Sequence, residues 1–299
     1  MRALSLTRRE CFLLAASALA SRAAGHRSRI SAEGYIFEQY AERQKKPLKD
    51  IIGEVFPMLR EAGFHNVELN PSFFAPDLRD QVLSAVRSNG LAMPSVYAGG
   101  GMHTKALAEQ TTKLALQVAG ICKPFGCTAV VTNADPKPGH ARKTDDELAV
   151  EAESFDNLGR VLAENGFQLR VHNHTPEMAD DAREWRYILQ HTNPKLVSFC
   201  VDVDWVHQGG LDPLQLLREA GRRVTGIHVR NSKDKLWLEA VGPGDIDYKA
   251  VAALLKDEGA KPLIVVELAY RENTVITRPL AADLRLSRIY TERAFGLRA

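Results

Sequence analysis

The 299-residue sequence predicts a single α/β domain, a (β/α)8 TIM barrel over residues 30–299. After residue 30, short β-rich runs alternate with longer amphipathic stretches, and this alternation repeats eight times. Several of the short runs, such as "LIVVEL", are almost continuously apolar, which is typical of parallel strands buried on both faces. A doubly wound open sheet is the alternative, but no G-x-G-x-x-G loop follows the first expected strand.

The elements follow from apolar spacing and from residues that begin and end helices. Thr144 is a typical helix N-cap, acidic residues follow it, and the helix is expected to end at Asn165 and Gly166. Gly63 ends an earlier helix that contains Pro57. Strands are expected at residues 34–40, 66–70, 92–97, 129–133, 168–172, 196–203, 224–229 and 262–268. Helices are expected at about 48–62, 77–89, 104–123, 145–165, 180–191, 212–221, 247–258 and 279–295.

Composition limits the classes of partner. The chain is 45% hydrophobic and carries a formal net charge of +2, with no stripe of Lys and Arg, so nucleic acid is not an expected partner. Cys122 and Cys127 are close enough in sequence to pair, but buried free thiols are the preferred interpretation.

The first 25 residues have the pattern of an export signal. A basic segment ends in Arg8 and Arg9, an apolar run follows from Cys11 to Ala20, and small residues come next. The paired arginines favour the twin-arginine route. The apolar run is shorter than the ~20 residues that span a bilayer, so the mature protein is expected in the periplasm or outside the cell, with no membrane anchor.

Polar side chains stand at the ends of the last four expected strands. These are His172, Asp202, His228 and Glu267, one from each strand. A barrel gathers its chemistry at the carboxyl ends of its strands, and adjacent strands lie ~4.8 Å apart, so these side chains are expected to converge. Taken singly, each has a structural explanation; Glu267, for example, has Arg230 and Arg271 as ion-pair candidates.

Taken together, the four side chains predict one bound divalent metal ion. Buried carboxylates are costly unless a cation neutralises them. Two imidazoles and two carboxylates form a mixed nitrogen and oxygen site, which suits Mn, Zn, Co or Fe better than Mg or Ca.

The same segments resemble the xylose isomerase-like TIM-barrel superfamily, whose members are often called sugar phosphate isomerases/epimerases. The resemblance extends from about residue 34 to residue 295 and includes "GFHNVELN", "VHNHTPEM", "VDVDWVHQGG", "GIHVRN", "VGPGDIDYKAV" and "VVEL". It implies a metal held by strands 5 to 8, usually through Glu, Asp, His and Glu. Here His172 takes the first position, in a His-Asn-His variant that is similar to a branch with exported members.

The resemblance implies a metal-dependent isomerase or epimerase that acts on a sugar, a keto-sugar or a polyol through an enediolate or enolate. Because His172 replaces one of the two glutamates that act as acid and base in the epimerases, Glu267 is expected to work with a different partner. His174 and Glu177 are the candidate catalytic partners, with His207 as a further candidate. The candidate substrate-binding residues are Glu68, Arg230, His207 and Trp205.

Other functions remain as alternatives. A metal-dependent lyase, either a keto-polyol dehydratase or a 3-keto-glycoside eliminase, would use the same enolate. A non-catalytic sugar-binding barrel belongs to a different class, and a homo-oligomer is compatible with each of these functions. An endonuclease IV-like enzyme shares the barrel, but it needs three metals and a basic DNA-facing surface, and this sequence offers too few extra ligands.

Overall fold

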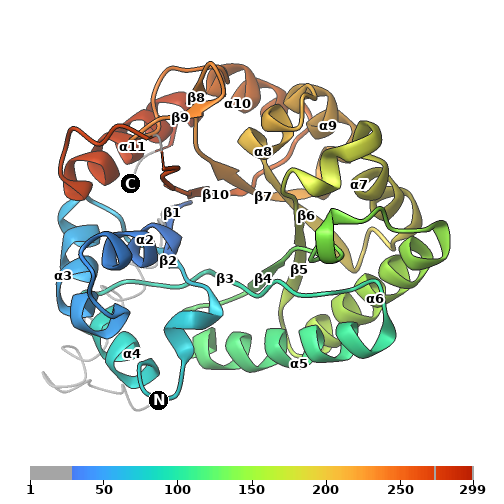
Figure 1. The fold of residues 1–299 in the computed structure, drawn as a ribbon, viewed down its shortest axis with the longest axis horizontal. Helices are drawn as coiled ribbons and strands as arrows, with labels where there is room; N and C mark the ends of the chain where they lie inside the picture. Colours follow the sequence, from blue (N-terminus) through green and yellow to red (C-terminus); the bar gives the residue numbers. More distant parts are fainter. Residues whose placement is uncertain (1–28, 273, 298–299) are drawn as a thin grey trace, which may run out of the picture.

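The computed structural model describes residues 29–272 and 274–297, which form a barrel of parallel strands surrounded by helices (Figure 1). The barrel strands are β1 (Ile30–Glu33), β2 (Val67–Glu68), β3 (Ser95–Tyr97), β4 (Ala129–Thr132), β5 (Gln168–His172), β6 (Val197–Asp202), β7 (Val224–Val229) and β10 (Leu263–Val266). The helices are α2 (Tyr35–Arg43), α3 (Leu48–Glu61), α4 (Arg79–Ser88), α5 (Lys105–Cys122), α6 (Asp145–Glu164), α7 (Ala179–His191), α8 (Val203–Gln208), α9 (Pro213–Ala220), α10 (Tyr248–Asp257) and α11 (Leu280–Phe295). Short 3-10 helices lie at η1 (Pro71–Phe74), η2 (Lys123–Phe125), η3 (Pro138–His140), η4 (Pro176–Met178) and η5 (Gly221–Arg223).

The strands are hydrogen bonded in the order β2-β1-β10-β7-β6-β5-β4-β3, which is the order of a barrel opened between β2 and β3. Two backbone hydrogen bonds link the flanks of that opening. Val67 N–H donates to the carbonyl of Ala92 at 2.9 Å, and Tyr97 N–H donates to the carbonyl of Leu69 at 3.0 Å. The sheet is therefore a nearly closed (β/α)8 barrel, which confirms the predicted fold class.

The prediction for the first strand was wrong. Residues 34–40 begin helix α2, and the first strand is Ile30–Glu33, just before them. The aromatic and branched residues of this run favour a strand locally. However, Ile36, Phe37 and Ala41 point to one side of a helix and are buried there, while all four residues of β1 are buried between β2 and β10. Tertiary burial thus overrides the local preference.

The other seven strands and the eight predicted helices are present within a few residues of their expected ends. Thr144 caps α6 in a reciprocal arrangement that satisfies two free backbone donors. Its hydroxyl accepts from Glu147 N–H at 3.2 Å, and the Glu147 carboxylate accepts from Thr144 N–H at 2.7 Å. Gly63 and Gly166 follow their helices with φ of 93° and 84°, a conformation that glycine adopts without strain.

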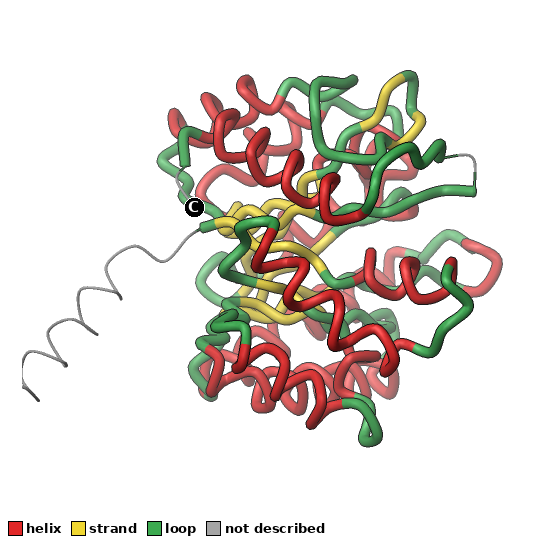
Figure 2. Tube along the Cα trace, turned by 90° about the vertical axis from the view of Figure 1, so that its left-hand side faces the viewer, coloured by secondary structure: helices red, strands yellow, loops and turns green. Residues whose placement is uncertain are grey.

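An inserted hairpin stands beyond the barrel strands. Strands β8 (Ser232–Lys233) and β9 (Leu236–Trp237) form it between β7 and α10, and Figure 2 shows it apart from the central strands. The turn residues Asp234 and Lys235 both have positive φ, which matches the twist of a tight hairpin. The hairpin brings Trp237 to the end of the barrel where the strand carboxyl ends lie.

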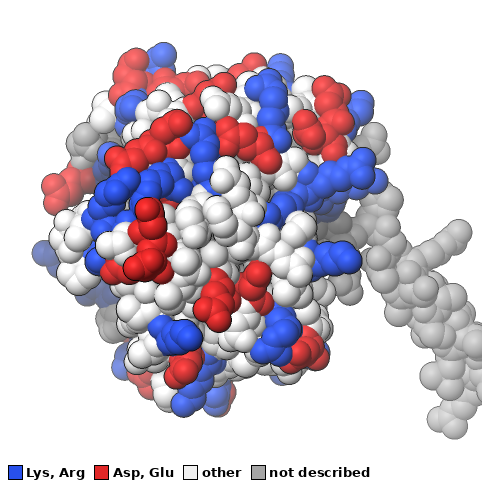
Figure 3. All heavy atoms as spheres, turned by 90° about the vertical axis from the view of Figure 1, so that its right-hand side faces the viewer, with Lys and Arg blue, Asp and Glu red and all other residues white. Residues whose placement is uncertain are grey.

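The outer surface carries mixed charge on the side that Figure 3 shows, where basic and acidic side chains are interspersed. Helix α7 lies on this side (Figure 1), and its Arg186 pairs with Glu219 of α9 at 2.8 Å. None of the helices in the described part of the chain has the length and apolar content needed to cross a bilayer. Cys122, Cys127 and Cys200 are free and buried, as expected for structural thiols. The predicted export signal, residues 1–25, lies outside the described residues.

The Thr144 cap generates a stability prediction. Thr144→Ala removes the hydroxyl acceptor and should lower the free energy of unfolding by about 1 kcal/mol, as measured by urea denaturation. Thr144→Ser keeps the acceptor and should stay close to the wild type. Equal losses in the two variants would show that the hydroxyl does not stabilise α6.

Candidate metal centre and its cavity

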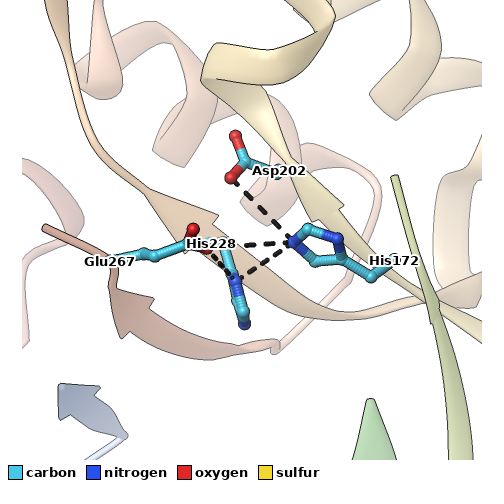
Figure 4. Close-up of side chains that lie close together, drawn as sticks. All are labelled: His172, Asp202, His228 and Glu267. Atoms are coloured by element: carbon cyan, nitrogen blue, oxygen red, sulfur yellow. Dashed lines mark hydrogen bonds and ion pairs between the residues drawn. The ribbon is translucent and has the colours of Figure 1, made fainter. Parts of the chain in front are cut away.

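Four side chains converge at the carboxyl ends of neighbouring strands. His172, Asp202, His228 and Glu267 each offer one ligand atom, and these atoms lie within 4.8 Å of one another (Figure 4). His172 Nε2 lies 3.9 Å from Asp202 Oδ2, 3.9 Å from Glu267 Oε2 and 3.1 Å from His228 Nδ1. The structure thus brings together the four residues that the sequence predicted as metal ligands.

The donor set and its spacing fit a transition-metal ion. Ligand atoms about 2.0–2.2 Å from one ion lie about 3–4 Å from one another. The three separations from His172 Nε2 fall in this range, while His228 Nδ1 and Glu267 Oε2 are closer, at 2.5 Å, and would have to separate slightly around an ion. Two imidazoles and two carboxylates favour Mn, Fe, Co or Zn.

Arg230 contacts both carboxylates of the cluster and offsets part of their negative charge. Its guanidinium donates to Asp202 Oδ2 at 2.8 Å and also to Glu267 Oε1. It packs over the rings of Trp205 and Trp237, with its central carbon 5.0 and 4.5 Å from the ring centres. Arg230 itself is buried, so this charge acts in a medium of low dielectric. Of the ion pairs considered from the sequence, the one between Glu267 and Arg230 is present.

Burial and charge set the protonation of the two carboxylates. Burial would raise the pKa of Glu267, but Arg230 and His228 outweigh it and hold that pKa well below its usual range. Burial raises the pKa of Asp202 to about 6 against the opposing effect of Arg230. Glu267 is therefore the more firmly ionised of the two.

The two histidines of the cluster also differ in the direction of their pKa shifts. Burial lowers the pKa of His172 well below its usual value, and the neighbouring rings of His228 and His174 add to the effect. The neutral form of His172 is the form that binds metals. Burial would also lower the pKa of His228, but Cys200 and Glu68 outweigh it and raise that pKa well above its usual value.

Glu68 lies beneath His228 rather than in the cavity. Its Oε1 atom is 2.8 Å from His228 Nε2, and its Oε2 atom accepts a hydrogen bond from the Ser95 hydroxyl. The side chain is completely buried and does not line the cavity, although the sequence suggested a substrate-binding role. In this position a carboxylate orients the imidazole, with Nδ1 turned toward the cluster.

The polar residues of the stretch "VHNHTPEM" make different contacts. Asn173 links the ends of β5 and β6, because its side chain donates to the carbonyl of Asp202 at 3.1 Å and accepts from Asp202 N–H at 3.0 Å. Glu177 accepts from His174 N–H at 3.0 Å. The ring of His174 packs edge-on against His172 and Trp205, with centroid distances of 4.8 and 5.7 Å.

A cavity of about 610 Å³ opens above the cluster. Six residues that the sequence predicted for the site line it: His172, His174, Trp205, His228, Arg230 and Glu267. Its other lining residues are Glu33, Tyr35, Gln39, Asn70, Pro71, Tyr97, Gly99, Asn133, Asp135, Trp237 and Tyr270. The cavity is lined by aromatic rings with a few charged groups, which is typical of a small-molecule site.

Besides the completely buried Asp202, two further predicted residues do not line this cavity. Glu177 is buried behind His174, where burial and the nearby Glu184 raise its pKa to about 8. His207 turns to the hairpin, with its Nε2 atom 3.3 Å from Asp245 Oδ2. Asp245 in turn accepts from the backbone N–H groups of the hairpin turn. These contacts favour supporting roles for both residues.

Sequence reasoning missed Glu33, Tyr97 and Trp237. Glu33 ends β1, and it escaped notice because the first strand was placed four residues too late. Tyr97 donates from its hydroxyl to Asn133 Oδ1 at 2.7 Å and packs edge-on against His172. Trp237 reaches the cavity only through the hairpin, and no strand-end pattern marks it.

Comparison with known proteins identifies the family. The model of the xylose isomerase-like TIM barrel family matches residues 56–289, and the chain belongs to this family. This agrees with the resemblance found in the sequence.

Individual relatives are distant. An inosose dehydratase from Clostridium perfringens is 21% identical over 264 residues, covering 78% of this chain and 86% of the relative. A solved sugar phosphate isomerase/epimerase from Parabacteroides distasonis superposes with a TM-score of 0.70 at 18% identity, covering 89% of this chain and 94% of that one. An L-ribulose 3-epimerase superposes with a TM-score of 0.67 at 14% identity, covering 83% and 90%.

The link made by Asn173 generates a prediction for the site. Asn173→Ala leaves the buried Asp202 N–H and C=O without their partner and should lower the free energy of unfolding by about 2 kcal/mol. Asn70→Ala is the matched control, since Asn70 lines the cavity and its side-chain oxygen accepts a long hydrogen bond, 3.4 Å, from the exposed Ser72 hydroxyl. Urea denaturation of both variants measures the difference, and equal stabilities would contradict the proposed link.

Proposed function

We propose that this chain is a divalent-metal-dependent lyase that removes water from a cyclic keto-polyol through an enolate. One observation carries the proposal: His172, Asp202, His228 and Glu267 meet at the base of a cavity large enough for a sugar-sized ring. The family membership and the inosose dehydratase relative support it.

The protein is an enzyme of the sugar-modifying class, either a lyase or an isomerase/epimerase, like the relatives that its sequence and fold resemble. The choice of a lyase within this class rests on sequence relatives that are named inosose dehydratases. It also rests on His172, because a symmetric epimerase needs two glutamates at the metal, and Glu267 is the one glutamate of the four-residue cluster found among the described residues.

His172, Asp202, His228 and Glu267 would hold the metal. A bound divalent ion supplies a Lewis acid that polarises a ketone oxygen and so acidifies the neighbouring C–H bond. Arg230 is fixed by Asp202, Glu267 and the two tryptophans, so it presents an oriented positive charge to an oxygen that becomes negative. Trp205 and Trp237 give the cavity an aromatic wall against which a ring can pack.

His174 is the proposed base. It lines the cavity, and burial lowers its pKa to about 4, so the ring is neutral at pH 7 and has a free lone pair. Glu267 also lines the cavity, but its carboxylate is engaged by both Arg230 and His228. Glu177 holds the backbone of His174 and thereby its ring orientation.

The metal site is tested by measuring metal content and affinity. The purified protein should bind about one divalent ion per chain, and His172→Ala or His228→Ala should reduce the affinity by roughly 100-fold or more. His191→Ala, on the exposed face of α7, is the matched control and should leave binding unchanged. Wild-type affinity in the two cluster variants would exclude this metal site.

The reaction is tested by incubating the metal-loaded protein with inososes and ketoses and following the products by NMR. Loss of water with formation of an enone supports the lyase, whereas inversion at a carbon beside the ketone supports the epimerase alternative. His174→Ala should lower kcat by roughly 10²–10⁴-fold while metal content stays the same. Tight sugar binding without turnover would support a non-catalytic sugar-binding barrel.

We also propose that the protein is exported by the twin-arginine route, because Arg8 and Arg9 precede a short apolar run. Replacing both arginines with lysine should leave an uncleaved precursor in the cytoplasm of a bacterium that has this route. Cell fractionation and N-terminal sequencing measure the outcome. Cleaved protein in the periplasm from the double variant would exclude this route.

A further inference from the structure

Glu33 lines the cavity on the side opposite to His174. It ends β1, which pairs with β10 on one side and β2 on the other, so Glu33 stands one strand beyond Glu267. In the ring of eight strands β1 and β5 are four positions apart, and Figure 1 shows them across the barrel from each other. A ring bound over the metal cluster would therefore lie between Glu33 and His174.

Glu33 is a buried carboxyl group that is held in a fixed orientation at the wall of the cavity. The side chain is 4% exposed, and the pairing of Ala32 with Val266 places it next to Glu267 on the neighbouring strand. The register places Glu33 directly beside Glu68 as well. One carboxyl oxygen, Oε2, accepts from Tyr35 N–H at 2.6 Å, which fixes the orientation of the group.

Several other polar residues of the cavity already have partners or are exposed to solvent. Tyr97 gives its hydroxyl proton to Asn133, and Tyr270 gives its own to Asp283. Arg230 is held by Asp202 and Glu267. Asp135 is exposed to solvent at the rim of the cavity.

We propose that Glu33 is the catalytic acid that protonates the leaving hydroxyl group. This inference rests on the proposed dehydration of a ketone with a hydroxyl at the β carbon. His174 takes the proton from the α carbon, and the electrons of that C–H bond first form the enolate. The electrons of the enolate then form the double bond between the α and β carbons. The C–O bond breaks, its oxygen takes the proton of Glu33, and water leaves. His174 then releases its proton to solvent and Glu33 regains one from solvent, so the net products are the enone and water.

The test uses Glu33→Gln in the full-length, metal-loaded protein. Glutamine has nearly the same size and its side-chain oxygen can still accept from Tyr35 N–H, but it has no acidic proton to give. Glu42→Gln, on the exposed end of α2, is the matched control and should behave as the wild type. Metal affinity and thermal unfolding of Glu33→Gln should match the wild type, which shows that the site is assembled.

Two reactions, dehydration and exchange of the α hydrogen, distinguish the role of the acid from the role of the base. Dehydration by Glu33→Gln should fall by roughly 10²–10⁴-fold in kcat. Exchange of the α hydrogen with D₂O needs only the base, and it should stay within about threefold of the wild type. A substrate with fluoride in place of the leaving hydroxyl needs no protonation, so the defect of the variant should shrink to below about tenfold.

The outcomes distinguish this proposal from the proposed function. A wild type that neither dehydrates nor exchanges would overturn the lyase itself, and the role of Glu33 with it. Unchanged dehydration in Glu33→Gln, while the wild type is active, would overturn only the role of Glu33. An equal loss of dehydration and exchange, or no rescue by fluoride, would likewise show that Glu33 is not the acid.

Discussion

The site depends on the compensation of buried negative charge at the carboxyl ends of β6 and β10. Asp202 and Glu267 lie within reach of the same guanidinium, that of Arg230, and of the imidazoles of His172 and His228. Each acid alone would be costly to bury, and their mutual repulsion would add to the cost. The positive and neutral donors around them make the arrangement stable, and the spacing of the four ligand atoms makes it a candidate site for a cation.

Groups that never reach the cavity hold this arrangement in place. Glu68 fixes one face of His228 from below, and Asn173 ties the backbone of Asp202 to the neighbouring strand. The candidate ligand side chains are thereby already oriented, and preorganised donors of this kind favour catalysis because no energy is spent on reorienting them. The three residues of "HNH" therefore serve different purposes: a ligand candidate, a structural link and a wall of the cavity.

Where sequence reasoning about particular residues failed, the cause was a competition between local and tertiary preferences. Residues 34–40 have the composition of a strand, yet helix α2 begins there, and Ile36 and Phe37 are buried on one side of that helix. That displacement hid Glu33. Glu177 and His207 follow strands 5 and 6 in the chain, as catalytic residues would. However, Glu177 contacts the backbone of His174, and His207 contacts Asp245 beside the hairpin.

The sequence by itself determined the barrel, the helix ends such as Thr144, and the four strand-end residues that meet, because periodicity and strand order are local properties that the barrel repeats eight times. Only the tertiary structure decided which polar residues face the cavity. The direction of a side chain near a strand end depends on register and on distant partners. Glu68 therefore lies beneath His228, and Trp237 reaches the cavity from the β8–β9 hairpin.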